Sequence, residues 1–377
     1  MLIKNSIIIK NFKLILYSII ISAFLLRVIL AIYYYFEGPL KFASEDAIKF
    51  HEIAIIFHDY GFTWDYFKTP MLPSIGWIYS YLLSLVYSVT QPSILVGNLL
   101  SCFFWLFTAI VLNLIMLDIN TKKVNQIITI LFFCFLPSSI VLSIFTLREI
   151  YQVFCFTISI YFYLKFYKYK KKEDFALLIV ATFFLALFHK TLFLISNIII
   201  FFAILSYLKI ETRSYKFFTI VGIFIGFTFM SNLFFFHYEF LNEINVMRSN
   251  HPIGRATYGL ETLGKDGTLI INLFFSIILY FLKPFLTDVA NYGDFIYIIE
   301  NVLRLIIIYK IITNIFSKNK LIQNVDINTS IFFICISLEF LWAIGTVNWG
   351  TALRHHYVVA PVLYTIYFNF SYEKNKK

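Results

Sequence analysis

Two adjacent acids near the start of this 377-residue chain are the first candidates for chemistry. Glu45 and Asp46 follow Ser44 and open a segment whose apolar spacing, through Phe50 and Phe57, predicts an amphipathic helix lying on a membrane surface. At about 100° per residue Asp46 falls on the apolar face, and a carboxylate directed into an apolar crevice suits a general base. The opposite face is charged and contains Glu45, Lys49, Glu52 and Asp59. A structural interpretation stays open, in which Ser44 caps the helix and both acids complement its dipole.

Basic residues at predicted turns could bind a phosphate group. Arg148 lies between two apolar stretches, and its planar guanidinium suits bidentate phosphate binding at a membrane boundary. Its neighbour Glu149 completes a Thr-x-x-Glu capping box that begins at Thr146, which gives this acid a structural role. Lys190 lies in a predicted hairpin, where its ammonium could equally reach lipid headgroups.

A second group of polar residues lies toward the C-terminus. Arg354 and His355 begin the last apolar stretch, after Gly350, which predicts a tight turn. His355 and His356 point in different directions on a helix, so the sequence predicts no shared metal ion. The segment 236–268 adds polar residues that we interpret as a solvated loop surface: Arg248, His251, Arg255 and Tyr258.

Four ionisable residues fall inside apolar stretches. Glu300 and Arg304 are spaced i, i+4 with the acid first, so we expect them to neutralise each other. Arg27 and Glu339 have no such neighbour and could pair with each other across a helix bundle.

Composition sets the class of protein. Of all residues 60% are apolar and 14% charged, whereas soluble domains carry about 25% charged residues. With a mean hydropathy of +0.80, the chain is expected to be an all-α, polytopic helical membrane protein. The net charge of +10 then reflects basic loops and attraction to anionic lipid, and we expect no nucleic-acid partner. The cysteines all lie in apolar stretches and are expected to be small core residues: Cys102, Cys134, Cys155 and Cys335.

Clusters of Lys and Arg indicate on which side of the membrane each connection lies. Short loops rich in these residues stay cytoplasmic, so an even number of crossings must separate neighbouring clusters. A crossing needs roughly 20 residues of helix. The sequence therefore predicts about ten transmembrane helices with both termini cytoplasmic: 14–36, 95–117, 126–146, 150–167, 174–188, 192–208, 217–235, 295–312, 329–346 and 355–370. The stretches 73–90 and 269–286 would break this parity, so we expect them to be interfacial or re-entrant helices on the outer side.

We expect residues 1–377 to form a single integral-membrane domain, with outer loops at 37–72 and 236–294. The first apolar run is too long for a cleaved signal peptide and contains Arg27, which predicts a signal anchor.

The pattern resembles the membrane-embedded sugar transferases of the GT-C superfamily and their relatives in bacterial polysaccharide gene clusters. The resemblance covers most of the chain and is carried by short motifs: Glu45-Asp46 after the first span, Pro137-Ser138 followed by Leu147-Arg148-Glu149, His189-Lys190, and Gly350-Thr351 with Arg354-His355. It implies a membrane glycosyltransferase that moves a sugar from a polyprenyl-phosphate donor to a glycan or lipid-linked acceptor on the outer face, in cell-surface polysaccharide assembly. The location that the resemblance implies is the bacterial cytoplasmic (inner) membrane, with the chain as a multi-pass protein.

The same resemblance assigns roles to residues. Asp46, or Glu45, would be the catalytic base, and the substrate-binding residues would be Arg148, Lys190, Arg354 and His355. A polyprenyl-phosphate sugar is already activated, so no cofactor and no metal are expected. The chain accordingly shows no Gly-rich nucleotide-binding pattern.

Two other function classes stay open. A Wzy-type oligosaccharide repeat-unit polymerase would use similar lipid-linked chemistry and typically depends on arginines in outer loops, which Arg248 and Arg255 would supply. A lipid or solute transporter is the non-enzyme alternative. Against it, the chain shows no internal inverted repeat, and its polar residues gather at the outer face rather than at the midplane.

Overall fold

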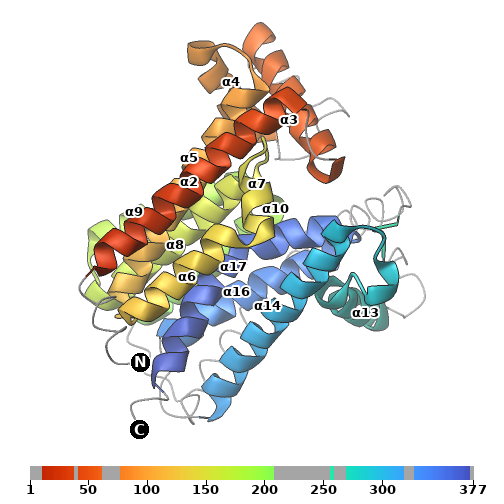
Figure 1. Cartoon of the computed structure of the whole chain (residues 1–377). Helices are drawn as coiled ribbons and strands as arrows, with labels where there is room; N and C mark the ends of the chain where they lie inside the picture. Colours follow the sequence, from red (N-terminus) through yellow and green to blue (C-terminus); the bar gives the residue numbers. More distant parts are fainter. Residues whose placement is uncertain are drawn as a thin grey trace. The chain divides into compact units, whose positions relative to one another are not determined.

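The computed structural model describes residues 11–37, 41–61, 77–207, 255–258, 269–317 and 327–373, and these are almost entirely helical (Figure 1). The only strand-like pairing among them is an isolated bridge between Thr257 and Asn348. The chain forms two compact units, Met1–Ile200 with Tyr357–Lys377, and Phe201–His356. The all-α prediction is therefore confirmed for this part of the chain.

Figure 1 labels the helices in chain order. Those that begin in the first unit are α2 (Phe12–Glu37), α3 (Lys41–Tyr60), α4 (Trp77–Thr90), α5 (Ile94–Asp118), α6 (Lys123–Phe135), α7 (Pro137–Ser143), α8 (Glu149–Tyr169), α9 (Lys172–Leu187) and α10 (Lys190–Tyr207). Those that begin in the second unit are α13 (Leu269–Leu282), the short 3-10 helix η2 (Leu286–Asp288), α14 (Tyr292–Ser317), α16 (Ile327–Gly345) and α17 (Trp349–Glu373). The predicted span 217–235 lies outside the described residues.

Three described helices, α2, α5 and α16, are long and apolar enough to cross a membrane by their length and composition. They coincide with the predicted spans 14–36, 95–117 and 329–346. A fourth crossing arises if α6 and α7, which meet at a bend of 56°, form one broken span. The described helices thus fit an integral membrane protein, and the total of ten crossings stays a prediction.

Helix α2 shows how such a helix meets both protein and lipid. One stripe, recurring every three or four residues, is buried and packs on α5 and α6: Phe12, Leu16, Ile20, Ala23, Arg27 and Ala31. The opposite face is equally apolar but uncovered, with Leu14 70% and Ile29 63% exposed. Such a continuous apolar face is unfavourable in water, so lipid is its natural surrounding.

The prediction of one continuous helix over 126–146 is wrong, because the helix breaks at Leu136. Pro137 has no N–H, so the carbonyl of Phe133 loses its helical donor, and the ring disfavours a helical conformation at the preceding residue. The Ser139 hydroxyl donates to that carbonyl instead. Pro137 is well placed as the first residue of α7, where a missing N–H has no consequence.

Arg27 of α2 reaches into this break and is fully buried. Its guanidinium donates to the carbonyl of Cys134 (2.9 Å) and to the hydroxyls of Ser139 (3.0 Å) and Ser143 (2.8 Å). It also lies over the indole of Trp105, 3.7 Å from the ring centroid. Hydrogen bonds from a charged donor contribute roughly 1.5–3 kcal/mol each, so Arg27 holds α2, α5, α6 and α7 together.

Helices α4 and α13 are too short for a simple crossing. Each has 14 residues, which at about 1.5 Å per residue gives roughly 21 Å, against a hydrocarbon core of about 30 Å. Helix α13 ends at Leu282, directly before Lys283-Pro284, where the sequence predicted an interruption. Their lengths support an interfacial or re-entrant position, which stays a prediction.

In the second unit, residues 255–258 form a strap against the starts of α14 and α17. Two backbone hydrogen bonds fix it, from Tyr258 N–H to the Val347 carbonyl (2.8 Å) and from Trp349 N–H to the Ala256 carbonyl (3.1 Å). Tyr258 is buried within the strap. These contacts make the strap part of the folded unit.

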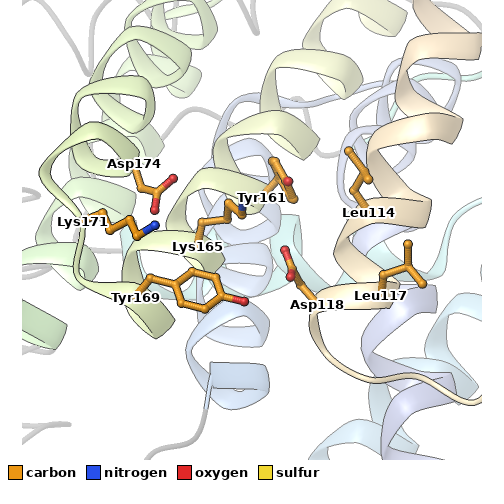
Figure 2. A pocket seen from close by; sticks show the side chains of 8 residues that line it. All are labelled: Leu114, Leu117, Asp118, Tyr161, Lys165, Tyr169, Lys171 and Asp174. Atoms are coloured by element: carbon orange, nitrogen blue, oxygen red, sulfur yellow. The ribbon is translucent and has the colours of Figure 1, made fainter.

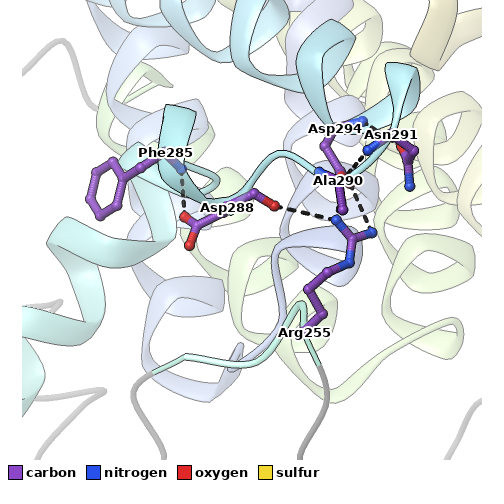
Figure 3. Close-up of polar contacts among 6 residues, drawn as sticks. All are labelled: Arg255, Phe285, Asp288, Ala290, Asn291 and Asp294. Carbon is purple, nitrogen blue, oxygen red and sulfur yellow. Dashed lines mark hydrogen bonds and ion pairs between the residues drawn. The ribbon is translucent and has the colours of Figure 1, made fainter.

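The side chain of Arg255 fixes the same strap to α14 (Figure 3). Its guanidinium makes a bidentate contact with the carboxylate of Asp294 and donates to the Asp288 carbonyl at 3.3 Å. The interpretation as a solvated loop surface is therefore wrong for Tyr258, which is buried, whereas Arg255 is exposed as predicted and is ion-paired with Asp294. Arg248 and His251 lie outside the described residues.

Asp294 is also the cap of its own helix. Its carboxylate accepts the Asn291 N–H at 3.2 Å, and the Asn291 side chain accepts the Asp294 N–H at 3.0 Å, which is a reciprocal capping box. Partial burial by itself would raise the pKa of Asp294. Hydrogen bonds from Arg255 and from the Ala290 N–H outweigh burial and hold that pKa below its usual value.

We expect the strap to withstand mild acid and to depend on the Asp294 charge. A carboxyl whose folded pKa is lowered stabilises the fold above its unfolded pKa, and this stability is lost as the pH falls through the folded pKa. Amide exchange of residues 256–258, followed by mass spectrometry, should therefore stay slow from about pH 8 to about pH 5 once corrected for intrinsic rates. Asp294→Asn should accelerate it about tenfold at neutral pH.

The control for this measurement is Asp59→Asn. Asp59 has a side chain that is 51% exposed and lies in the first unit, so its neutralisation should not alter exchange in the strap. Unchanged exchange in Asp294→Asn would show that the backbone contacts alone hold the strap.

Candidate functional site

Helix α3 has the amphipathic phase that the sequence predicts. Ala54 and Phe57 are buried, Asp46 is half-buried on the same side, and the predicted charged face is exposed: Glu45, Lys49, Glu52 and Asp59. Asp46 and Phe50 are one turn apart, so they lie on one face of the helix. The prediction that Asp46 lies on the apolar face of α3 and Glu45 on the charged face is thereby confirmed, while their catalytic roles stay predictions.

Helix α4 covers the apolar face of α3. The Ser80 hydroxyl donates to the Phe50 carbonyl at 3.0 Å, and Nδ1 of His51 lies 2.7 Å from the Tyr87 hydroxyl. Burial lowers the pKa of His51, so at neutral pH the ring is uncharged and Nδ1 can accept a hydrogen bond from the Tyr87 hydroxyl. Helices α3 and α4 are therefore joined by both hydrogen bonds and apolar packing.

Arg148 lies at the start of α8 and reaches α3. Its guanidinium carbon is 5.7 Å from the centroid of the Phe50 ring, and the residue is half-buried. Within the first unit the structure thus brings Arg148 to the face of α3 that carries Asp46, one turn from it. These are the two sequence-predicted residues that would bind the phosphate and remove the proton.

Aromatic rings complete this part of the unit. The Phe50 ring meets Tyr79 of α4 edge-on at 5.1 Å, and Tyr79 in turn lies 4.8 Å from Tyr151 of α8. Tyr151 is three residues after Arg148, one turn further along α8. Phe50 therefore touches both α8 and α4, and the rings fix the distance between Arg148 and α3.

The turn before Arg148 is held by long-range contacts, and the predicted capping box is wrong. The Thr146 hydroxyl donates to Asn98 Oδ1 at 2.8 Å, so it turns to α5 and not to the N-terminus of α8. A Cβ atom on Gly97 would lie 2.5 Å from the Thr146 hydroxyl oxygen, so only glycine allows this close approach. Glu149 is 5% exposed in the first turn of α8, where the helix dipole favours a negative charge.

Lys190 lies apart from this group along the chain. It is the first residue of α10, and its side chain lies outside the described residues. The neighbouring His189 caps the helix, because its Nδ1 accepts the Thr191 N–H at 3.1 Å. A cap explains the presence of a polar residue at His189 without substrate binding.

Arg354 and His355 belong to the second unit, at the start of α17. His355 stacks on Trp342 with ring centroids 4.5 Å apart, and its Nδ1 lies 3.0 Å from the Thr346 hydroxyl. Arg354 is half-exposed and close enough to Tyr297 of α14 to act on its hydroxyl electrostatically. Their roles in substrate binding stay predictions.

The predicted tight turn at Gly350 is wrong. Gly350 is the second residue of α17, and the turn is made by Asn348, whose side-chain oxygen accepts the N–H groups of Gly350 (2.8 Å) and Thr351 (3.3 Å). Asparagine is a favoured residue at a helix N-terminus for this reason.

One buried polar cluster of the second unit was not predicted as a unit. Glu339 of α16 accepts the Tyr280 hydroxyl at 2.8 Å, and the same oxygen lies 2.6 Å from Nδ1 of His356. All three side chains are at most 2% exposed. The suggested pair between Glu339 and Arg27 is therefore wrong, because each has other partners. As predicted, His355 and His356 point to different partners.

The contacts of His356 fix how many protons this cluster holds. Its Nε2 lies 3.2 Å from the Tyr280 carbonyl, which can only accept, so Nε2 carries a proton. Its Nδ1 then needs a second proton to approach Glu339 at 2.6 Å, held on either the imidazole or the carboxyl. Either arrangement gives the pair no net charge, which lets it stay buried and join α13, α16 and α17.

A sequence signal for this cluster does exist. Glu339 and His356 lie in consecutive predicted spans joined by a short turn, so two polar residues near that turn can meet. Tyr280 lies 59 residues before Glu339, and no local pattern indicates its contact. No group of three or more His, Cys, Asp or Glu side chains that could hold a metal ion occurs in the described ranges. The four cysteines are buried and unbridged, as predicted.

Comparison with known proteins finds no matching family model, no matching curated protein and no matching solved structure. The function is therefore argued from the residues and their geometry.

Proposed function

We propose that this chain is a membrane glycosyltransferase that moves a sugar from a polyprenyl-phosphate donor to an acceptor hydroxyl at the outer face of the membrane. One observation carries the proposal. The guanidinium of Arg148 lies against Phe50, one helical turn from the half-buried Asp46. A phosphate ligand and a proton acceptor, predicted from segments about 100 residues apart in sequence, thus belong to one face of the first unit.

The proposed step needs these two groups, the lipid-linked sugar donor and the acceptor hydroxyl. The acceptor oxygen attacks the anomeric carbon, the bond from that carbon to the phosphate oxygen breaks, and the acceptor proton passes to the Asp46 carboxylate. Arg148 stabilises the negative charge that stays on the lipid phosphate. The half-buried Phe50 offers a ring edge or face for the sugar, because aromatic side chains present large, rigid apolar surfaces.

The membrane setting of the proposal follows from the charge pattern. We place about ten spans in a bacterial inner membrane, as a single integral-membrane domain with both termini cytoplasmic, so that α3 and Arg148 face outward. Arg354 and His355 would then lie on the same outer side, at the start of the last span, and could bind further groups of the donor or acceptor.

The repeat-unit polymerase is the second candidate, and the ion pair that Arg255 makes with Asp294 weakens it. An outer-loop arginine that binds a lipid pyrophosphate must present its guanidinium to the substrate. Both outer nitrogens of Arg255 contact Asp294 instead.

Labelling of the lipid-linked sugar pool tests the reaction class. Cells that lack the gene, pulsed with radiolabelled sugar, should accumulate the single-sugar lipid donor if the chain is a transferase. Complete lipid-linked repeat units would accumulate if it is a polymerase, and an unchanged outer pool with a growing inner pool would indicate a transporter.

Asp46 and Glu45 provide a matched pair of variants on one helix. Asp46→Asn keeps the shape of the side chain but removes the proton acceptor, so transfer should fall roughly 10²–10⁴-fold. Glu45→Gln, on the exposed face, should transfer sugar at the wild-type rate. Glycan assembly in cells, with membrane levels checked by blot, measures both. If both variants transfer sugar at the wild-type rate, Asp46 and Glu45 only complement the helix dipole and neither is the base.

Arg148 should tolerate neither loss nor replacement of its guanidinium. Arg148→Lys keeps the charge but loses the planar two-pronged geometry, so it should reduce transfer nearly as much as Arg148→Ala, roughly 10²–10³-fold. The control is Lys49→Ala, which removes a cation from the exposed face of α3. Full transfer by Arg148→Ala at normal protein levels would contradict the phosphate role.

A further inference from the structure

The first unit contains a pocket of about 370 Å³ where α5 and α8 end and α9 begins. Figure 2 shows the side chains around it, with charged groups from all three segments directed into one space. Its lining residues are Leu114, Leu117, Asp118, Tyr161, Lys165, Tyr169, Lys171 and Asp174. Arg148 is 17 residues before Lys165 along α8, roughly 26 Å away, so this pocket is separate from the site described above.

The pocket holds two cations and two carboxylates that make no direct ion pair, although Asp118 and Asp174 act electrostatically on Lys165. Lys165, Lys171, Asp118 and Asp174 all line it, yet the ion pairs of the described ranges include none between these four. The Lys165 ammonium instead lies 5.6 Å from the centroid of Tyr161 and 5.9 Å from that of Tyr169. Opposite charges held apart around one space suit a ligand that itself carries both signs.

One wall of the pocket is apolar and faces outward. Leu114 and Leu117 are 37% and 50% exposed, and they lie one turn apart on α5. Helix α5 is a candidate membrane span that ends at Asp118, so the pocket lies where the span meets the headgroup layer. An acyl chain can therefore lie along the two leucines while its headgroup occupies the charged end.

We propose that this pocket binds a phospholipid whose headgroup carries both a phosphate and a primary ammonium, as in phosphatidylethanolamine. The phosphate would contact Lys165 and Lys171, and the ammonium would donate to Asp118 and Asp174 and lie near the Tyr169 ring. The four side chains sum to zero charge, which matches a zwitterion. A choline headgroup has no N–H to donate, and an anionic glycerol headgroup leaves both carboxylates without a cation.

The site does not rest on the proposed sugar transfer. It can be tested on the purified full-length protein in detergent, by native mass spectrometry with dioctanoyl phosphatidylethanolamine, phosphatidylcholine and phosphatidylglycerol. We expect the ethanolamine lipid to be retained in preference to the other two. Lys171→Gln and Asp174→Asn should each weaken its retention about tenfold, which is the loss of roughly one charge-assisted hydrogen bond.

The chain offers matched controls one residue away. Lys172→Gln and Glu173→Gln make the same charge changes on exposed residues of α9 that do not line the pocket, so both should retain the lipid as the wild type does. Elution volume and helicity, measured for all four variants, verify their fold.

Three results would overturn the proposal. Stronger retention of phosphatidylglycerol would mean that the basic segment attracts anionic lipid in general. An equal loss in Lys172→Gln or Glu173→Gln would mean that net charge, not the pocket, controls retention. Displacement of the lipid by free phosphoethanolamine at the same concentration would mean that a soluble ligand, not a lipid, occupies the site.

Discussion

A buried arginine at a broken helix is the interaction on which the first unit depends. A helix in lipid must satisfy its backbone groups internally, and the break at Pro137 leaves carbonyls of α6 without their helical donors. Arg27 and Ser139 supply donors for them, and these contacts tie α2 to α6 and α7. Removing the guanidinium would leave the Cys134 carbonyl without a donor in a dry interior, at a cost of about 1–3 kcal/mol. The short α7 and the turn after it lead directly to Arg148, so the place of the break decides where Arg148 lies.

Local patterns in the sequence were sufficient for some of this structure. Helical periodicity predicted which side of α3 carries Asp46, and apolar runs located α2, α5 and α16. The failures concern side chains whose partners are distant. Thr146 has the spacing of a capping box, but its hydroxyl finds Asn98, 48 residues earlier, because Gly97 lets α5 approach closely. The four residues 146–149 by themselves cannot indicate a hydrogen-bond partner so distant in the sequence.

The sequence does contain a signal for the break between α6 and α7. Pro137 stands inside the predicted span 126–146, and Arg27 stands inside another. A proline that frees carbonyls and a buried cation that needs acceptors are complementary requirements in a bundle without water. Pairing Arg27 with Glu339 followed the sign of the charges alone. In the structure, Arg27 donates to neutral acceptors instead, and one proton is shared between Glu339 and His356.

The charged groups of the proposed lipid pocket differ from these buried groups in the partners that they contact. Arg27 and Glu339 are buried and hydrogen-bonded to neighbouring helices, whereas Lys165 and Asp118 line a pocket and interact across it without a direct ion pair. A buried charge with complete partners stabilises one arrangement of helices. A charged group that lines a pocket can also contact a ligand that enters it.

Helix α8 connects the two proposed sites and sets their separation. It has 21 residues, which gives about 31 Å, close to the hydrocarbon thickness of about 30 Å. Of its residues 13 are buried, so protein rather than lipid surrounds it. This explains why it can carry polar side chains such as Gln152 and still match the membrane in length. With Arg148 before its first turn and Lys165 near its last, this one helix would place the two proposed phosphate-binding groups at opposite headgroup layers.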